Sequence, residues 1–343
     1  MCEIIAKLIP HVLELLPRCK EYLFFGVDGD VLDLPRTPEL EAAGYLGQAI
    51  SESSETYSLK MYSVWITELI SGTRVAVSLQ NVCDEIAGFL SLLQQSWVST
   101  NNIVFVFDRL FFCNELVDKI INKKQFFVCR MRRSKSNKEL TAFFSNDEVW
   151  TNITINGFSI RLVKAFARNS DKVIVLATNL DANVFSNAEV SAIYQRRWGC
   201  ETANRTTTCS CLLDRFHTDF LNGILQEIFT YVLLSLITGA FVSRSIDERS
   251  RFLPTDLGYY KPSLVQIIRE IKARGTALFS SANERSIEEI MDVANRSVEY
   301  RVHGSRSYNR VVKYGHERRF SSMSMPRLAK EAERKRVRTI IAC

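Results

Sequence analysis

The chain has 343 residues, of which 46 % are hydrophobic, so it is long enough to bury one large core or two moderate ones. This composition, without any low-complexity tract, excludes a disordered protein. Its nine cysteines form no Cys-x-x-Cys pair, and the N-terminus lacks a signal pattern, which argues against a secreted disulfide scaffold. We therefore expect free thiols in a reducing compartment: the cytoplasm or nucleoid of a bacterium, or the nucleus of a eukaryote.

The net charge of +6 is unevenly distributed. Residues 301–343 carry twelve Arg or Lys against three Glu, so the rest of the chain sums to −3. A second cluster at 123–138 has seven cations and no acid. Such clusters indicate a polyanionic partner, although a solubilising surface or a disordered tail would have the same composition.

The first part of the chain predicts an α/β fold. After an N-terminal helix interrupted by Pro10 and Pro17, residues 22–35 predict a strand, a turn at Asp28-Gly29 and a second extended piece. The next segments predict a polar loop at 36–56, a hairpin of strands at 57–69 and 73–80, a helix at 82–97, a buried strand at 102–108, an amphipathic helix at 114–124 and a strand at 125–132. Three strands followed by alternating helix and strand indicate a mixed sheet with helices on its faces, the pattern of a ribonuclease-H-like core.

The second part predicts an all-β insertion and then helices. A long helix is expected from 187 to 208, capped by Ser186 or Asn187. The apolar run 225–242 contains Glu227 and is shorter than a span of roughly 20 residues, so we expect a buried core helix and no membrane partner. The segments are an N-terminal helical segment (1–20), the first part of the core (21–132), the β-rich insertion (133–182), the second part of the core (183–245), a C-terminal helical region (246–300) and a basic tail (301–343).

Three carboxylates stand out in this order of elements. Asp28 and Asp108 follow apolar strands, where an acid can be held rigidly at the edge of a cleft. Glu201 lies on the predicted long helix. Each has a structural alternative: aspartate often begins a turn, and Glu201 has Arg197 and Arg205 four residues away on either side, the spacing of helical ion pairs. Three carboxylates from separate elements would also suit a hard divalent cation such as Mg²⁺.

The motifs around these acids resemble those of the DDE transposases of the insertion sequence four group. The resemblance rests on "GVDGDVLDLP", "FVFDRLFFCNEL" and "YQRRWGCE", and it runs from about residue 22 to about residue 240. That group carries a helix signature of Tyr, two residues, Arg, three residues, Glu, six residues and Lys. Tyr194, Arg197 and Glu201 match its first three positions.

The resemblance implies a ribonuclease-H-like enzyme that cleaves and joins DNA strands at transposon ends. Asp28, Asp108 and Glu201 would bind two Mg²⁺ or Mn²⁺ ions. Tyr194 and Arg197 would contact DNA phosphates, and a homodimer would act on paired ends. Thr208 stands where the family has its lysine; together with the short segment before Asp28, it leaves open a decayed or domesticated transposase that binds DNA without cutting.

Further DNA contacts are expected outside the signature. Arg205, one turn after Glu201, could replace the missing lysine. The basic cluster contributes Arg130, Arg132 and Arg133. Trp150 in the insertion could stack on a flipped base or could simply pack within its sheet. For Trp198 we expect core packing.

Overall fold

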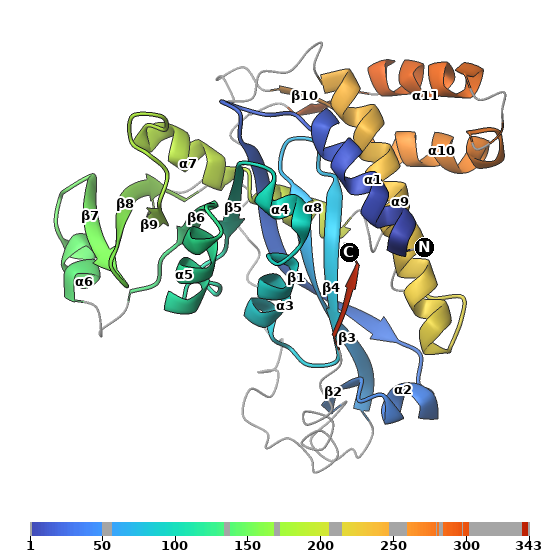
Figure 1. The fold of residues 1–343 in the computed structure, drawn as a ribbon, viewed down its shortest axis with the longest axis horizontal. Helices are drawn as coiled ribbons and strands as arrows, with labels where there is room; N and C mark the ends of the chain where they lie inside the picture. The colour runs from blue at the N-terminus through green and yellow to red at the C-terminus, as the bar shows by residue number, and fades with distance from the viewer. Residues whose placement is uncertain are drawn as a thin grey trace.

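A ten-stranded mixed sheet runs through the molecule (Figure 1). The computed structural model describes residues 2–49, 57–133, 138–167, 172–205, 215–246, 259–278, 280, 284–296, 298–301 and 338–341. The strands of the large sheet are β1 (Leu23–Leu34), β2 (Leu46–Ala49), β3 (Tyr57–Glu68), β4 (Arg74–Gln80), β5 (Ile103–Phe107), β6 (Phe126–Arg130), β7 (Trp150–Ile155), β8 (Phe158–Phe166), β9 (Val173–Thr178) and β12 (Arg338–Ile341); β10 (Tyr259–Pro262) and β11 (Val298–Arg301) form a separate pair. The helices are α1 (Cys2–Leu15), α2 (Pro38–Ala42), α3 (Glu85–Leu92), α4 (Ser96–Ser99), α5 (Asn114–Asn122), α6 (Lys138–Ser145), α7 (Asn187–Gln195), α8 (Trp198–Arg205), α9 (Leu221–Ile246), α10 (Leu264–Leu278) and α11 (Glu284–Arg296).

The centre of the sheet has the strand order β4-β3-β1-β5-β6. β1, β3 and β4 pair antiparallel, whereas β1, β5 and β6 pair parallel, with α3 and α5 in the connections before and after β5. This is the predicted ribonuclease-H-like core. The predicted hairpin and the alternation of helix and strand after it are confirmed.

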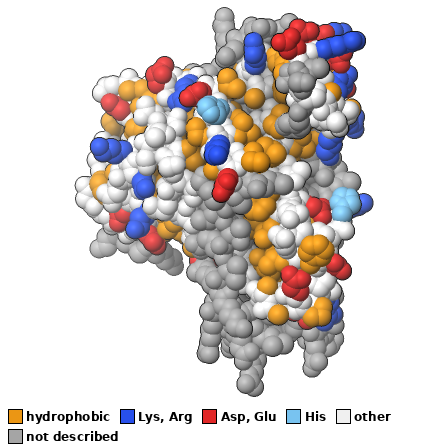
Figure 2. Space-filling model, turned by 45° about the vertical axis from the view of Figure 1, so that its right-hand side comes forward, with side chains coloured by type: hydrophobic (Ala, Val, Ile, Leu, Met, Phe, Trp, Pro, Cys, Tyr) orange, Lys and Arg blue, Asp and Glu red, His pale blue; other side chains and the backbone are white. Residues whose placement is uncertain are grey.

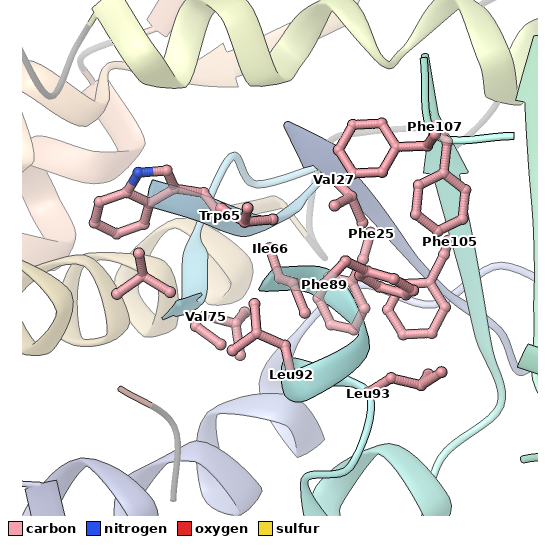
Figure 3. Close-up of a cluster of buried hydrophobic side chains, with 14 of the residues drawn as sticks. Phe25, Val27, Trp65, Ile66, Val75, Phe89, Leu92, Leu93, Phe105 and Phe107 are labelled. Atoms are coloured by element: carbon pink, nitrogen blue, oxygen red, sulfur yellow. The ribbon is translucent and has the colours of Figure 1, made fainter. Parts of the chain in front are cut away.

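One face of the central sheet packs on α3. Phe25 and Val27 of β1 and Phe105 and Phe107 of β5 point toward this helix (Figure 3). The ring of Phe89 on α3 lies 5.0 Å from that of Phe105 and 4.9 Å from that of Phe107, both edge-on. Because side chains alternate along a strand, the even-numbered residues of β1 and β5 face the other way.

That second face packs on α7 and α8. Phe24 of β1 and Val104 and Val106 of β5 share a buried cluster with Tyr194 of α7 and Cys200 of α8. The same alternation directs positions 28 and 108, just beyond the last parallel pair, toward this helical face. The fold therefore brings both predicted aspartates to the side of the sheet that carries Glu201.

The insertion differs from the all-β unit predicted. It contains a helix, α6, whose Leu140 and Phe143 are buried in the same core as Ile153 of β7 and Leu162 of β8. Its strands also extend the main sheet, because β9 pairs antiparallel with β6. Turn residues and alternating strands were visible in the sequence, but this long-range pairing was not.

The apolar helix α9 packs inside the protein. It is the one helix of the described residues that is long and apolar enough to cross a membrane, and half of its most apolar window is buried. It packs against α1, β4, α10 and α11 (Figure 1). These contacts are those of a core helix. The ion pair Arg274–Glu289 joins α10 to α11, and Arg285–Glu289 lies within α11. Figure 2 shows acidic and basic side chains close together near the top right of the molecule.

Other expectations about local structure need correction. No turn occurs at Asp28-Gly29: β1 continues to Leu34 because β3 pairs with it along this stretch. The predicted helix 187–208 breaks at residues 196–197 into α7 and α8. The predicted loop contains α2 and β2. Residues 338–341 of the basic tail form β12 beside β4, whereas residues 302–337 lie outside the described residues.

Candidate active site

The two aspartates lie at the same level of the sheet, Asp28 in β1 and Asp108 directly after the neighbouring strand β5. Val27 and Phe107 are the last paired residues of the parallel strands β1 and β5. Asp28 and Asp108 are the residues that follow them. Asp108 thus follows a buried strand as predicted, whereas Asp28 lies within β1, at the point where its pairing with β5 stops and that with β3 continues.

Close packing of α8 on β1 brings Glu201 to this place. A Cβ atom at Gly26 would overlap the Sγ of Cys200 and lie 2.7 Å from Leu69 Cδ2, so only glycine allows this approach. Cys200 is fully buried, and Glu201 is the next residue. The absence of a side chain at Gly26 therefore allows α8, the helix that carries Glu201, to pack closely on β1.

Electrostatic coupling shows that these acids share one environment. The pKa of Asp28 is raised to about 6, mainly by burial. Arg197 acts in the opposite direction, and Glu85 and Glu201 raise this pKa further. The pKa of Glu85, at the start of α3, is raised by burial and by Asp108. Asp28 is therefore flanked by negative charge from α3 as well as from α8.

Arg197 supplies positive charge among these carboxylates. Its Nη2 donates to Oε1 of Glu201 at 3.1 Å, which confirms the helical ion pair considered above. Burial alone would lower the pKa of Arg197, but Tyr194, Asp108 and Asp28 raise it above its ordinary value. Burial likewise raises the pKa of Tyr194, with Arg197 lowering and Asp108 raising it. The three matched positions of the helix signature thus lie together beside Asp28 and Asp108.

Two functional candidates were missed in the sequence. Asn204, on α8, donates from Nδ2 to Oδ2 of Asp28 at 3.1 Å. Its Oδ1 accepts a hydrogen bond from Nη2 of Arg74, a buried residue of β4. Asn204 follows Glu201 by three residues, so helical spacing could have placed it on the same face. Nothing local marks Arg74, which begins an ordinary apolar strand.

The three acids offer the oxygen donors that Mg²⁺ and Mn²⁺ take. Their chemistry and their shared face fit such ions. Their present geometry does not yet form a complete site: among the described residues, no group of three or more Asp, Glu, His or Cys side chains is close enough together to hold an ion. Instead, Oε1 of Glu201 accepts a hydrogen bond from Arg197, and Oδ2 of Asp28 accepts one from Asn204.

A basic pocket opens next to Asp108. It has a volume of about 500 Å³ and is formed between the segment after β5, the end of β6 and the insertion. Arg109, Arg132 and Arg133 line it together with polar residues such as Asn114 and Thr154. None of the described residues that line it is acidic.

The other residues predicted to contact DNA differ in how far they are exposed. Arg130 is half-buried and contributes to the environment of Tyr194. Trp150 is 50 % exposed at the start of β7, so it is not packed in the core. Trp198, the first residue of α8, is 38 % exposed, which corrects the prediction of core packing. The side chain of Arg205 and the whole of Thr208 lie outside the described residues.

Comparison with known proteins identifies the family. Residues 27–237 match the transposase DDE domain, and the chain belongs to this family. Comparison with curated protein sequences gives no match. Among solved structures, the chain is similar to the piggyBac transposase in a cryo-EM structure of its synaptic complex with hairpin DNA, with a TM-score of 0.43 and 11 % identity. The match covers 85 % of this chain and 61 % of that chain.

Proposed function

We propose that the protein is a DNA transposase of the insertion sequence four group, which cleaves and transfers DNA strands at transposon ends. The observation that carries this proposal is that Asp28 lies in β1 and Asp108 directly follows the adjacent parallel strand β5, at the face of the sheet that packs on α8, the helix that bears Glu201. In a chain with a transposase DDE domain, these are the three acids expected to act together.

Asp28, Asp108 and Glu201 would hold two Mg²⁺ or Mn²⁺ ions, which supply Lewis-acid stabilisation of phosphoryl transfer when bound. The chain's own residues bind and orient the DNA. Arg197 would exchange its contact with Glu201 for a DNA phosphate, which a guanidinium grips with two parallel hydrogen bonds. Tyr194, held next to it, would donate its hydroxyl proton to a phosphate oxygen.

The basic pocket supports DNA as the partner. Arginine side chains bind phosphates through charge-assisted hydrogen bonds, and this pocket begins at Arg109, immediately after Asp108. A DNA strand lying across the three acids would therefore meet Arg132 and Arg133 next. The exposed Trp150 remains a candidate for stacking on a base, and Arg205 one for a further phosphate. By family analogy, two copies would act on paired ends.

Substitution of Glu201 tests the proposal. Glu201→Gln keeps the size of the side chain but removes the charge that a metal ligand needs. We expect Mg²⁺-dependent nicking of supercoiled plasmid to fall at least about 100-fold, while plasmid binding is retained. Glu289→Gln is the matched control, because Glu289 is likewise paired with an arginine four residues away, on α11.

The outcomes separate the alternatives. Equal nicking by the wild type and Glu201→Gln would reject Glu201 as a ligand. If the wild type binds DNA but does not nick it with Mg²⁺ or Mn²⁺, the chain is a decayed or domesticated transposase that acts as a DNA-binding protein. If it does neither, the proposed function is wrong.

A further inference from the structure

Arg74 is in an unusual environment for a charged side chain. It is the first residue of β4 and has no exposed surface. Its guanidinium carbon lies 4.1 Å from the ring centre of Trp65 and 5.9 Å from that of Tyr231. These two rings, perpendicular to each other, form a cation–π cage. Its backbone N–H is fixed by Ser235 Oγ of α9 at 2.9 Å.

The hydrogen bonding of this guanidinium is incomplete. Nη2 donates to Asn204 Oδ1. Nε and Nη1 are buried and have no hydrogen-bond partner within the described part of the chain. A buried charged group that lacks partners destabilises a fold. Arg74 is thus a poor choice for stability alone, and its one side-chain acceptor leads directly to the proposed active site.

Arg74 also determines the orientation of Asn204. An arginine only donates hydrogen bonds, and an ionised carboxylate only accepts them. The side-chain amide of Asn204 lies between the guanidinium of Arg74, a donor, and the carboxylate of Asp28, an acceptor. Its oxygen must therefore face Arg74, and its NH₂ group must face Asp28, as observed. A flipped amide would place its NH₂ group against Arg74 and its oxygen against Asp28, which would be repulsive at both ends.

We propose that Arg74 and Asn204 are positioning residues for Asp28: Arg74 fixes the amide of Asn204, and Asn204 holds one carboxylate oxygen of Asp28 in place. The inference rests on the proposed function, because it assigns to Asp28 the role of a metal ligand. The caged guanidinium is a rigid anchor, so the orientation of Asp28 is set by β4 and α8 before any metal or DNA arrives. Hydrogen-bond partners of this kind fix the direction of a ligand and tune its affinity.

Three variants test the pair. Asn204→Ala removes the link, Arg74→Met replaces the guanidinium with a neutral side chain of similar length that still packs on aromatic rings, and the third variant combines both changes. Binding of Mn²⁺ to the full chain without DNA is measured by electron paramagnetic resonance, alongside plasmid nicking and thermal unfolding. Ser245→Ala is the control, because it removes a partly buried hydrogen bond of α9, to Asn295 at 2.9 Å, away from Asp28.

We expect each single variant to weaken Mn²⁺ binding and nicking by about 10- to 100-fold, the usual effect of losing such an outer partner. The double variant should be no worse than Asn204→Ala, because Arg74 acts through Asn204. Arg74→Met should unfold at the same temperature as the wild type or higher, since it removes a buried, incompletely paired charge. Ser245→Ala should change only the unfolding temperature.

A purely structural pair would behave differently. Unchanged Mn²⁺ binding and nicking per folded molecule, with lower unfolding temperatures, would overturn the inference. So would additive losses in the double variant. A wild-type chain that does not bind Mn²⁺ or nick plasmid would instead refute the proposed function on which the inference rests, so the two failures are distinct.

Discussion

At the scale of single residues, the position of Asp28 destabilises the ionised form of its carboxylate. The fold buries its carboxylate beside Glu85 and Glu201, and its pKa rises to about 6 from an ordinary 3.8. The folded chain therefore binds this proton more tightly than the unfolded chain does. By linkage, the contribution of Asp28 to stability falls as the pH rises from about 4 to about 6 and stays low above that range.

Because ionisation of Asp28 lowers the stability of the folded chain, we can predict the effect of Asp28→Asn in the absence of metal. The amide cannot ionise, so the variant should be more stable than the wild type at pH 7.5, by up to about 3 kcal/mol for a shift of about two pKa units. The difference should vanish near pH 4. Thermal unfolding in chelator between pH 4 and 8 measures it, with Asp147→Asn, at an exposed position before β7, as the baseline. A difference that does not change with pH would show that burial of this charge is not its cause.

At the scale of elements, the approach of α8 to β1 decides where Glu201 lies. The close contact is between Gly26 and Cys200. Gly26→Ala should push α8 away from the sheet, which would lower both stability, by about 1–3 kcal/mol as in other overpacked cores, and Mg²⁺-dependent nicking.

Removing the obstructing atom should reverse part of this loss. The double variant Gly26→Ala with Cys200→Ala should recover stability and nicking relative to Gly26→Ala alone, because the new methyl group then occupies the space of Sγ. Gly275→Ala is the control: it lies in α10 with open space around its Cβ position and should stabilise by about 0.5–1 kcal/mol. A double variant no better than Gly26→Ala would mean that another contact holds α8.

The same elements show what local sequence could and could not predict. The apolar run at 102–108 predicted β5 and placed Asp108 at its end, and the helical period at 114–124 predicted α5. Asp28 was expected in a turn, because the Asp-Gly dipeptide is a turn signal; the pairing of β1 with β3 overrides it. Asn204 and Asp28 are 176 residues apart, and only the packing of α8 on β1 brings them together. Long-range pairing of this kind has no local signature.

At the scale of the whole molecule, the sheet runs unbroken from the ribonuclease-H-like core into the insertion. β6 pairs with β5 on one side and with β9 on the other. The insertion is therefore a continuous extension, and the basic pocket forms where it meets the core beside Asp108. Phosphates bound there would have a fixed position relative to the three acids, which a flexible appendage could not provide.

Salt dependence can test this path for DNA. Each phosphate contact contributes about 0.9 to the slope of log K against log salt for duplex DNA. Arg132→Ala combined with Arg133→Ala should therefore weaken binding to duplex DNA and reduce the magnitude of the slope by about 2. Fluorescence anisotropy of a labelled duplex at several salt concentrations measures both quantities.

A control with the same change in net charge separates the pocket from general attraction. Arg285→Ala combined with Arg296→Ala removes two arginines from α11, where both are paired with acids. If DNA lies in the pocket, this control should keep the wild-type slope, because neither side chain would touch a phosphate. Equal losses in the two double variants would mean that only the overall field of the protein attracts DNA. DNA would then reach Asp28, Asp108 and Glu201 by another route, and the adjacent arginines would have no special part in orienting it.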